Sequence, residues 1–403
     1  MAVSQAHRAG PCRPVRPRVT RALFCGHTRR DEPGGPAFDL DRSPPVPHNF
    51  TIMDNPYQQQ PQRAFWRSAV ADLSAIEMHG VYQPSFAITP DMRIAAAGSC
   101  FAQHIAAQFK ARGFGFLDTE PAPPMLDADS AKEFGYGLYS ARYGNIYSVR
   151  QLVQLFDRAA SRFAPRDDIW ETNGKYYDPF RPTIQPGGFA SEAELRLDRD
   201  FHLCQVARLL EQTDLFVFTF GLTEAWVNRH DGAVLPTCPG THAGRYDPET
   251  YAFKNFRVSE VLEDAESFIA MARRHNPAMR FLFTVSPVPL TATATDQHVL
   301  PATVYSKSVL RAACGELMEA HDFVDYFPSY ELVASHPMRG IFFRPNMRNV
   351  AAEGVARVMD IFFAAHGAAA PVAPSATEEQ ASEPATVSGD PACDEEILEF
   401  FQK

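Results

Sequence analysis

The sequence has few cysteines, no long apolar run and no excess of basic residues. Seven Cys in 403 residues are too few, and odd in number, for a small disulfide-stapled scaffold. No stretch of about 18 apolar residues occurs, so we expect no membrane span. Acids outnumber bases by 48 to 38, which argues against a general nucleic-acid binder. Because 45% of the residues are hydrophobic, the chain can build a core.

Motifs for cofactors and metals are also missing. The sequence contains no Gly-x-Gly-x-x-Gly and no Walker loop, so no nucleotide cofactor is expected. Cys238 and His242 are close in sequence, but no second pair follows at zinc-site spacing, and no metal site is predicted. The N-terminal residues contain no convincing secretory signal, and the spacing of the cysteines does not indicate disulfide pairs. These features favour a cytoplasmic protein.

Both ends differ in composition from the body. Residues 1–52 are rich in Pro and Arg and are expected to be a disordered extension, with Met53 as the start of the folded part. Residues 367–403 are expected to be a disordered acidic tail, because most of them are too polar to order. Its last residues regain large apolar side chains behind three acids, which predicts a short helix. We interpret this end as a frayed tail or as a docking motif for a protein partner.

Residues 53–366 carry the fold, in which short β-type runs alternate with helical patterns. The expected strands are 92–98, 113–117, 214–221, 279–286 and 321–329. The expected helices are 101–112, 191–212, 257–275, 303–320 and 352–365. Continuous apolar strands alternating with helices predict an α/β three-layer sandwich with a central, mostly parallel sheet. Two stretches break the alternation, 118–190 and 228–256, and are expected to be irregular cap insertions.

The residues that follow the strands form the candidate site, because ligands of such sheets lie outside the carboxyl ends of the strands. Ser99 and Cys100 stand where the first strand turns into a helix. The helix N-terminus would lower the pKa of a thiol and offer donors to an oxyanion. Cys100 is therefore the preferred nucleophile and Ser99 the second candidate. The structural alternative is a tight turn with a capping Ser99 and a small buried Cys100.

The motif GSCFA at 98–102 resembles the signature of the GSCFA-domain family, whose relatives are the SGNH/GDSL-type hydrolases. Six further blocks resemble that family in the same order: RYGNIYS (142–148), DPFRP (178–182), FTFGLTEAW (218–226), TVSPVPL (284–290), YSKSVLRA (305–312) and YFPSYEL (326–332). The resemblance covers roughly residues 55–365. It implies an SGNH/flavodoxin-like fold with a nucleophile third in the first motif, which is Cys100 here.

The resemblance also implies roles for residues after the other strands. Gly144 would supply a backbone donor to the oxyanion hole, with Asn145 beside it as a side-chain donor. Thr223 replaces an Asn of the SGNH pattern, and its hydroxyl can still donate. Glu224 would orient a base or cap the next segment.

The last SGNH block, Asp-x-x-His, has no counterpart here. The corresponding stretch reads Asn-Met-Arg-Asn at 346–349, and Asn cannot accept the proton of the nucleophile near neutral pH. A thiol depends less on a base than a hydroxyl does. The His candidates for a base are, in order, His298, His336 and His242. Arg344 and Arg348 are candidates to bind a carboxylate or sulfate of a substrate.

Two functions from different classes follow. The first is an SGNH-like acyl esterase or acyltransferase, a hydrolase or transferase that acts on O-acyl groups of a carbohydrate or polysaccharide through an acyl-enzyme on Cys100. Its partner is a small-molecule or glycan substrate, and aromatic residues of the insertions would suit sugar faces. The alternative is a non-catalytic module that binds a glycan or acyl ligand. The missing Asp-x-x-His base favours this alternative.

Overall fold

The computed structural model describes residues 55–367 and 393–401. The chain divides into two units, 1–58 and 59–403. Of the first unit only residues 55–58 are described, at the start of the short 3-10 helix η1 (Pro56–Gln59). The predicted extension 1–52, with Met53, and most of the predicted tail lie outside the described residues. The fold below is therefore that of the second unit.

Four parallel strands form the central sheet, in the order β1 (Ile94–Gly98), β4 (Leu215–Phe220), β8 (Arg280–Val285) and β9 (Val324–Tyr326). Nearly all of their residues are buried, because helices cover both faces. Residues 113–117 do not form the expected additional strand. They make a single parallel bridge, between Phe116 and Ile94, and Gly113 takes a left-handed turn just before it.

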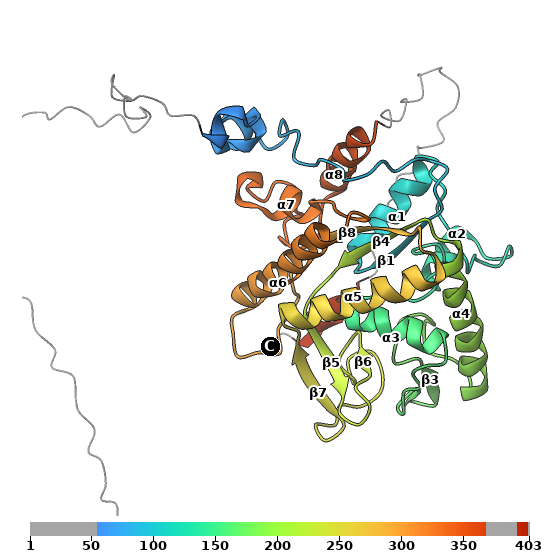
Figure 1. The fold of residues 1–403 in the computed structure, drawn as a ribbon. Helices are drawn as coiled ribbons and strands as arrows, with labels where there is room; N and C mark the ends of the chain where they lie inside the picture. The colour runs from blue at the N-terminus through green and yellow to red at the C-terminus, as the bar shows by residue number, and fades with distance from the viewer. Residues whose placement is uncertain (1–54, 368–392, 402–403) are drawn as a thin grey trace, which may run out of the picture. The chain divides into compact units, whose positions relative to one another are not determined.

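Helices cover both faces of this sheet, which confirms the predicted three-layer α/β architecture (Figure 1). Alternate strand residues point to opposite layers, as Ala96 and Ala97 do. One layer consists of α1 (Phe101–Ala111), α7 (Ser329–Ala334) and α8 (Ala352–Ala365). The other consists of α3 (Val149–Ala159), α5 (Val258–His275), α6 (Val299–Ala320) and the end of α4 (Glu192–Gln212).

The insertions are only partly irregular. The stretch 118–190 contains α2 (Ala128–Glu133), the hairpin β2 (Trp170–Thr172) and β3 (Lys175–Tyr177), and α3. The sequence did not predict α3, which belongs to the helical layer. It begins with a capping box of Ser148 and Gln151, and its apolar face joins the core. The second insertion forms an antiparallel sheet of β5 (Glu224–Asn228), β6 (Val234–Leu235) and β7 (Tyr251–Asn255).

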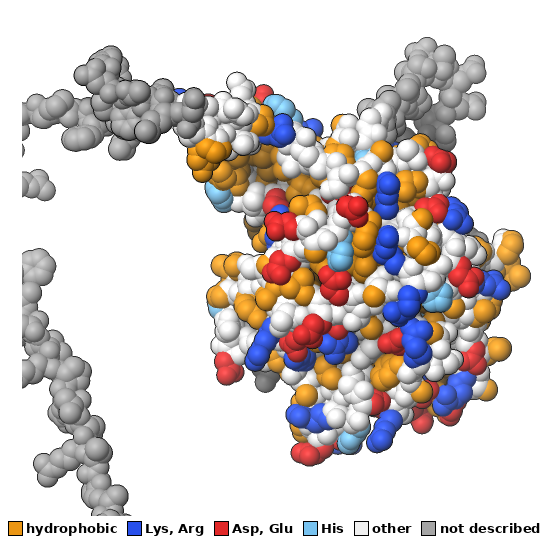
Figure 2. Space-filling model, viewed as in Figure 1, with side chains coloured by type: hydrophobic (Ala, Val, Ile, Leu, Met, Phe, Trp, Pro, Cys, Tyr) orange, Lys and Arg blue, Asp and Glu red, His pale blue; other side chains and the backbone are white. Residues whose placement is uncertain are grey.

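Short helical turns complete the described chain: η2 (Gln62–Ala64), η3 (Arg67–Ala71), η4 (His336–Met338) and η5 (Asp394–Phe401). None of the helices within 55–367 and 393–401 is both long and apolar enough to cross a membrane. The face drawn in Figure 2 carries basic and acidic side chains intermingled. That face therefore lacks the basic stripe typical of a nucleic-acid interface.

Candidate functional site

Cys100 lies at the turn from β1 into α1, as the sequence predicts. Gly98 makes this turn possible with a φ of +138°, because a Cβ there would lie 2.4 Å from the carbonyl oxygen of Thr219. The amide of Ser99 donates to the same oxygen at 3.1 Å. Cys100 is the N-cap residue of α1 and is only 3% exposed. Its thiol therefore faces a closed crevice beside the helix N-terminus.

The crevice is occupied by residues 393–401 of the same chain, which we call the C-terminal segment. It comprises Cys393 and the helix η5, drawn in red beside β5 in Figure 1. Cys100 and Cys393 line the same small cavity of this crevice, and each is the first influence on the pKa of the other. The sequence left two interpretations of these residues open, a frayed tail or a docking motif for a protein partner. In the structure they dock on the crevice of their own chain.

The lowered thiol pKa belongs to Cys393. The hydrogen bond from Cys100 and the charge of Arg348 lower the pKa of Cys393 to about 6. The same hydrogen bond, together with burial, raises the pKa of Cys100 well above its ordinary value. We expected the helix N-terminus to lower the pKa of Cys100. The difference arises because Cys100 is the more buried thiol, and burial disfavours the charged form, whereas Arg348 binds the sulfur of Cys393 directly.

Arg348 reaches the crevice from a tight turn in the Asn-Met-Arg-Asn block. The side chain of Asn346 holds this turn by accepting the amides of Arg348 at 3.1 Å and Asn349 at 3.0 Å. The Arg348 guanidinium donates to the sulfur of Cys393 at 3.2 Å and lies 3.6 Å from the carboxylate of Glu395. The block that lacks an acid and a His thus supplies a buried cation to the site.

Asp394 is the best-anchored residue of the C-terminal segment. Its carboxylate accepts hydrogen bonds from Asn145 Nδ2 at 3.0 Å and from the Thr183 hydroxyl at 2.7 Å. Its amide donates to the hydroxyl of Tyr147 at 3.1 Å, and its carbonyl oxygen lies 2.9 Å from His242 Nε2. A carboxylate therefore occupies a position that is lined by hydrogen-bond donors.

The orientation of Asn145 is fixed from behind. Its Oδ1 accepts the hydroxyl of Tyr139 at 2.5 Å and Gln103 Nε2 at 3.3 Å, so its amide nitrogen faces the crevice. Tyr139 also donates to the carbonyl oxygen of Ser99. Gly144, with a φ of +68°, makes the turn that precedes Asn145. The predicted pair Gly144 and Asn145 thus lies beside the Ser99–Cys100 turn.

Lys307 is a buried cation of the site that the sequence analysis missed. Its Nζ donates to the carbonyl oxygen of Gly221 at 2.6 Å, and burial lowers its pKa to about 8. Gly221 packs tightly, because a Cβ there would lie 3.0 Å from the Cβ of Ser99. Burial also raises the pKa of Glu395 to about 8, against the charges of Arg348 and Lys307. The signal was a Lys in an otherwise apolar helix face of the YSKSVLRA block.

Three other residues that the sequence predicts for the site are Ser99, Thr223 and Glu224. The hydroxyl of Ser99 is buried and has no hydrogen-bond partner among the described residues. The hydroxyl of Thr223 donates to Asn255 Oδ1 at 2.6 Å, which joins β5 to β7. Glu224 accepts the Thr293 hydroxyl at 2.6 Å, and burial raises its pKa.

The predicted base His298 lies at the exposed N-cap of α6, where its Nδ1 accepts the amide of Leu300. His336 stacks on Trp66, with ring centroids 5.4 Å apart. Of the three candidate His residues, only His242 touches the C-terminal segment. The groups whose charge or hydrogen bonding acts on the Cys100 thiol include Cys393, Arg348 and Glu395, and His104 lines the same small cavity.

Two cavities adjoin the C-terminal segment. A cavity of about 510 Å³ lies between the segment and the β5–β7 sheet, and its walls include Trp226, Tyr246 and Phe253. A second cavity, of about 10 Å³, is lined by Cys100, Cys393 and Arg348 among others. The larger one has room for an organic ligand, whereas the smaller one has room for about one water molecule.

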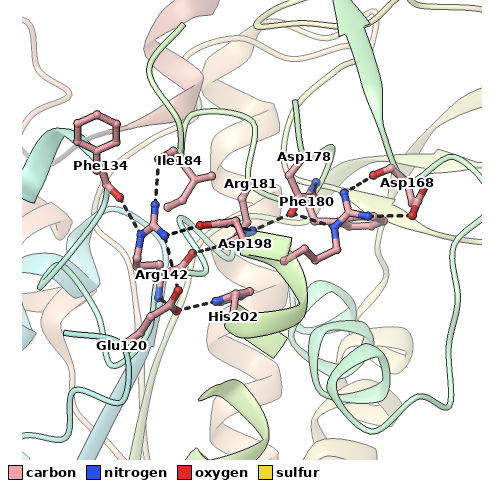
Figure 3. A network of polar contacts seen from close by, with 11 residues as sticks. Glu120, Phe134, Arg142, Asp168, Asp178, Phe180, Arg181, Ile184, Asp198 and His202 are labelled. Carbon is pink, nitrogen blue, oxygen red and sulfur yellow. Dashed lines mark hydrogen bonds and ion pairs between the residues drawn. The ribbon is translucent and has the colours of Figure 1, made fainter. Parts of the chain in front are cut away.

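A buried network of charges supports the loops of the site (Figure 3). Arg142 donates to Asp198 at 2.8 Å and to the carbonyl oxygen of Phe134 at 3.0 Å, and its own amide donates to Glu120 at 2.8 Å. His202 Nδ1 lies 2.7 Å from the same Glu120 carboxylate. Burial, with the nearby charge of Arg181, lowers the pKa of His202 to about 4.

Asp178 is the centre of the second half of this network. It pairs with Arg181 at 3.0 Å and with Arg199 at 3.3 Å, and Arg181 continues to Asp198 at 2.8 Å. Burial alone would raise the pKa of Asp178, but the neighbouring guanidinium groups hold it below its ordinary value. The network ties the blocks RYGNIYS and DPFRP to α4, and so fixes the loop that carries Asn145.

The described residues include no group of three or more His, Cys, Asp or Glu side chains placed to hold a metal ion. A comparison with curated proteins finds no match. The profile of the GSCFA family matches residues 93–362, about two thirds of the chain, from β1 into α8. The C-terminal segment lies beyond this match. By the extent of the match, the chain belongs to the GSCFA family.

Proposed function

We propose that this protein is a cysteine-dependent acyl hydrolase or acyltransferase that uses Cys100 as its nucleophile. One observation carries the proposal: Cys100 lies at the N-terminus of α1, near a buried Arg348 and an Asn145 amide that already binds a carboxylate. These are a nucleophile, a charge that lowers the pKa of its thiol against the raising effects of Cys393 and burial, and donors for an oxyanion. The resemblance of the motif to SGNH hydrolases supports the same reaction class.

The reaction would proceed through a thioester. The Cys100 thiolate attacks the acyl carbon, the bond to the alcohol oxygen breaks, and the alcohol leaves with a proton. Water or an acceptor hydroxyl then attacks the thioester and releases Cys100. Asn145 Nδ2 and backbone N–H groups at the start of α1 would stabilise the oxyanion.

Lys307 becomes our first candidate to move the proton, ahead of His298. Its pKa of about 8 suits proton transfer near neutral pH, and the charge of Cys100 is one of the influences on that pKa. His298 is held at the exposed N-cap of α6 by its bond to Leu300. The base that the Asp-x-x-His block would supply is then replaced by a lysine from another helix.

We propose an O-acyl group on a carbohydrate or polysaccharide as the substrate. The resemblance to SGNH relatives suggests this class, and the cavity of about 510 Å³ supports it with the aromatic side chains of Trp226, Tyr246 and Phe253. Such walls suit both sugar faces and acyl chains.

A second candidate function is a non-catalytic module that binds a glycan or acyl ligand. The observation that favours it is that the carboxylate and the amide of Asp394 both have hydrogen-bond partners in the crevice. A binding site provides such partners for a ligand. No catalytic step is needed to explain those donors.

Acyl labelling of Cys100 tests the two against each other. The full chain is exposed under reducing conditions to an activated acetyl ester, and adducts are read by intact mass and peptide mapping. Asp394→Ala is included, because it removes the carboxylate that occupies the site. The enzyme proposal expects one adduct, faster in Asp394→Ala than in wild type and absent in Cys100→Ala. An adduct lost only in Ser99→Ala would move the nucleophile to Ser99. A lack of any site-specific adduct in Asp394→Ala would favour the binding module.

A further inference from the structure

Three hydrogen bonds hold Cys393 and its neighbour Asp394 in the crevice that contains Cys100. Asn145 and Thr183 hold the neighbouring Asp394, and Arg348 binds the Cys393 sulfur directly at 3.2 Å. Both cysteines are free and line the same cavity of about 10 Å³. Two free thiols in one small cavity, with a guanidinium in contact with one of the sulfurs, form the arrangement of a reactive dithiol.

We propose that Cys100 and Cys393 form a redox site, in which a hydroperoxide converts the two thiols to a disulfide that closes the crevice. In the first step the Cys393 thiolate attacks one oxygen of hydrogen peroxide and the O–O bond breaks. The sulfur becomes a sulfenic acid, and the other oxygen leaves as hydroxide, which takes a proton from solvent and becomes water. In the second step the Cys100 sulfur displaces the hydroxyl group of that sulfenic acid, which leaves as water after taking the Cys100 proton.

The order of the two steps follows from the surroundings of each sulfur. Arg348 contacts Cys393 and favours its thiolate, and Cys393 is less buried than Cys100. The cavity that both cysteines line is large enough for a molecule of about the size of water, and it is too small for an acylated sugar. Among peroxides, the small size of this cavity therefore favours hydrogen peroxide, and Cys393 is the half-buried sulfur of the pair that it would meet first.

Other described cysteines are poorer candidates for this chemistry. Burial raises the pKa of Cys238 to about 11 and raises that of Cys314 further. Cys204 is exposed on α4. Selective oxidation of the Cys100–Cys393 pair would hold the C-terminal segment in place covalently, and a thiol reductant would release it. The site is independent of whether Cys100 transfers acyl groups.

The test treats the reduced full chain with hydrogen peroxide and maps linked peptides by non-reducing mass spectrometry. We expect a Cys100–Cys393 linked peptide in the monomer, reversed by dithiothreitol and absent in Cys393→Ser. At pH 7, Arg348→Gln should slow its formation by about tenfold, which corresponds to a rise of about two units in the pKa of the Cys393 thiol. Sulfinic acid on Cys393 without the link, or a link only between two molecules, would overturn the proposal.

A relocated thiol supplies the control for tethering. Cys393→Ser combined with Glu399→Cys keeps one cysteine in the segment but moves it to an exposed position of η5. We expect no link from this cysteine to Cys100. Equal linking of the relocated thiol would show that membership of the same chain, rather than the docked geometry, is enough to join the sulfurs. Acylation of Cys100, measured separately, reports on the proposed function and leaves this mapping result unaffected.

Discussion

Asn145 turns its amide nitrogen toward the carboxylate of Asp394, 3.0 Å away, because Tyr139 and Gln103 hold its amide oxygen on the other side. The donor that we assign to the oxyanion is thus oriented before any substrate arrives. Such orientation in advance is what makes a hydrogen-bond donor effective in catalysis. The same geometry explains why an acidic residue of the chain itself occupies this position.

Removal of the Asn145 amide should therefore slow acylation much more than it reduces stability. In an Asp394→Ala background, we expect Asn145→Ala to lower the acylation rate of Cys100 by about 10²–10³-fold, as for other oxyanion donors. Tyr139→Phe should give a smaller loss, because it frees the amide to rotate but leaves it present. The rates are measured by quenched intact-mass time courses. Equal rates with and without Asn145 would remove it from the oxyanion site.

The docked C-terminal segment should become less stable as pH rises, through Glu395. Its pKa is about 8 when docked and 4.5 ordinarily, so the docked state holds a proton that the undocked state releases between these values. The contribution to stability is full below about pH 4.5 and is lost as pH rises towards 8. Arg348, Lys307, Cys393 and Glu224 also act on this carboxyl.

Comparison with Glu395→Gln cancels the other groups, because Gln stays neutral at every pH. We expect the Tm of wild type relative to Glu395→Gln to fall between pH 5 and 8 by more than about 2 °C. Glu399→Gln, at an exposed position of the same segment, is the matched control and should show no such trend. A pH-independent difference for Glu395→Gln would contradict the burial of a protonated carboxyl.

Asp178→Asn should strongly destabilise the protein, because it leaves Arg181 and Arg199 buried around a neutral amide. Loss of one partner of a buried ion pair costs about 3–5 kcal/mol. Arg67→Gln breaks the exposed pair with Asp72, which lies outside the network, and should cost less than about 1 kcal/mol. Urea titrations of both variants give the two free energies of unfolding. Similar values would show that the network in Figure 3 contributes little beyond surface pairing.

Gly98→Ala should be among the most damaging substitutions of the site. The new methyl group would meet the carbonyl oxygen of Thr219 at 2.4 Å, on a strand that cannot move without breaking the sheet. Gly80→Ala is the control, since its left-handed φ is similarly unfavourable but nothing lies within 4 Å of the added Cβ. We expect a cost of about 1 kcal/mol for the control and loss of soluble folded protein for Gly98→Ala. Folded Gly98→Ala with native stability would refute the close approach.

The fold could be predicted because short apolar runs in the sequence mark the main strands of the sheet. LFVFTF and RFLFTV are continuous apolar runs that only a sheet buried on both faces explains, and they became β4 and β8. Helix α3 was missed because it lies inside a stretch rich in Pro, Gly and aromatic residues. Its own start signal, Ser148 followed by Gln151, was present but was not used.

The site was predictable only where one motif supplies it. Cys100 and Asn145 follow from short blocks that resemble the family. Lys307 and Cys393 act through contacts with residues far away in sequence, which spacing does not reveal. Composition also pointed away from Cys393, because the polar stretch before it is typical of a tail without structure. His298 was chosen as a candidate base from its place in a loop, and spacing alone did not reveal that it is the N-cap residue of α6.

Because the occupant of the crevice is part of the same chain, ligand affinity becomes a competition within one molecule. A tethered segment acts at an effective concentration in the millimolar range, whatever the dilution of the protein. A free ligand binds only the fraction of molecules in which Asp394 has left Asn145, so its apparent Kd exceeds its intrinsic Kd by the inverse of that fraction. Screens of the intact chain will therefore underestimate every ligand of this crevice by the same factor, and Asp394→Ala restores the intrinsic scale.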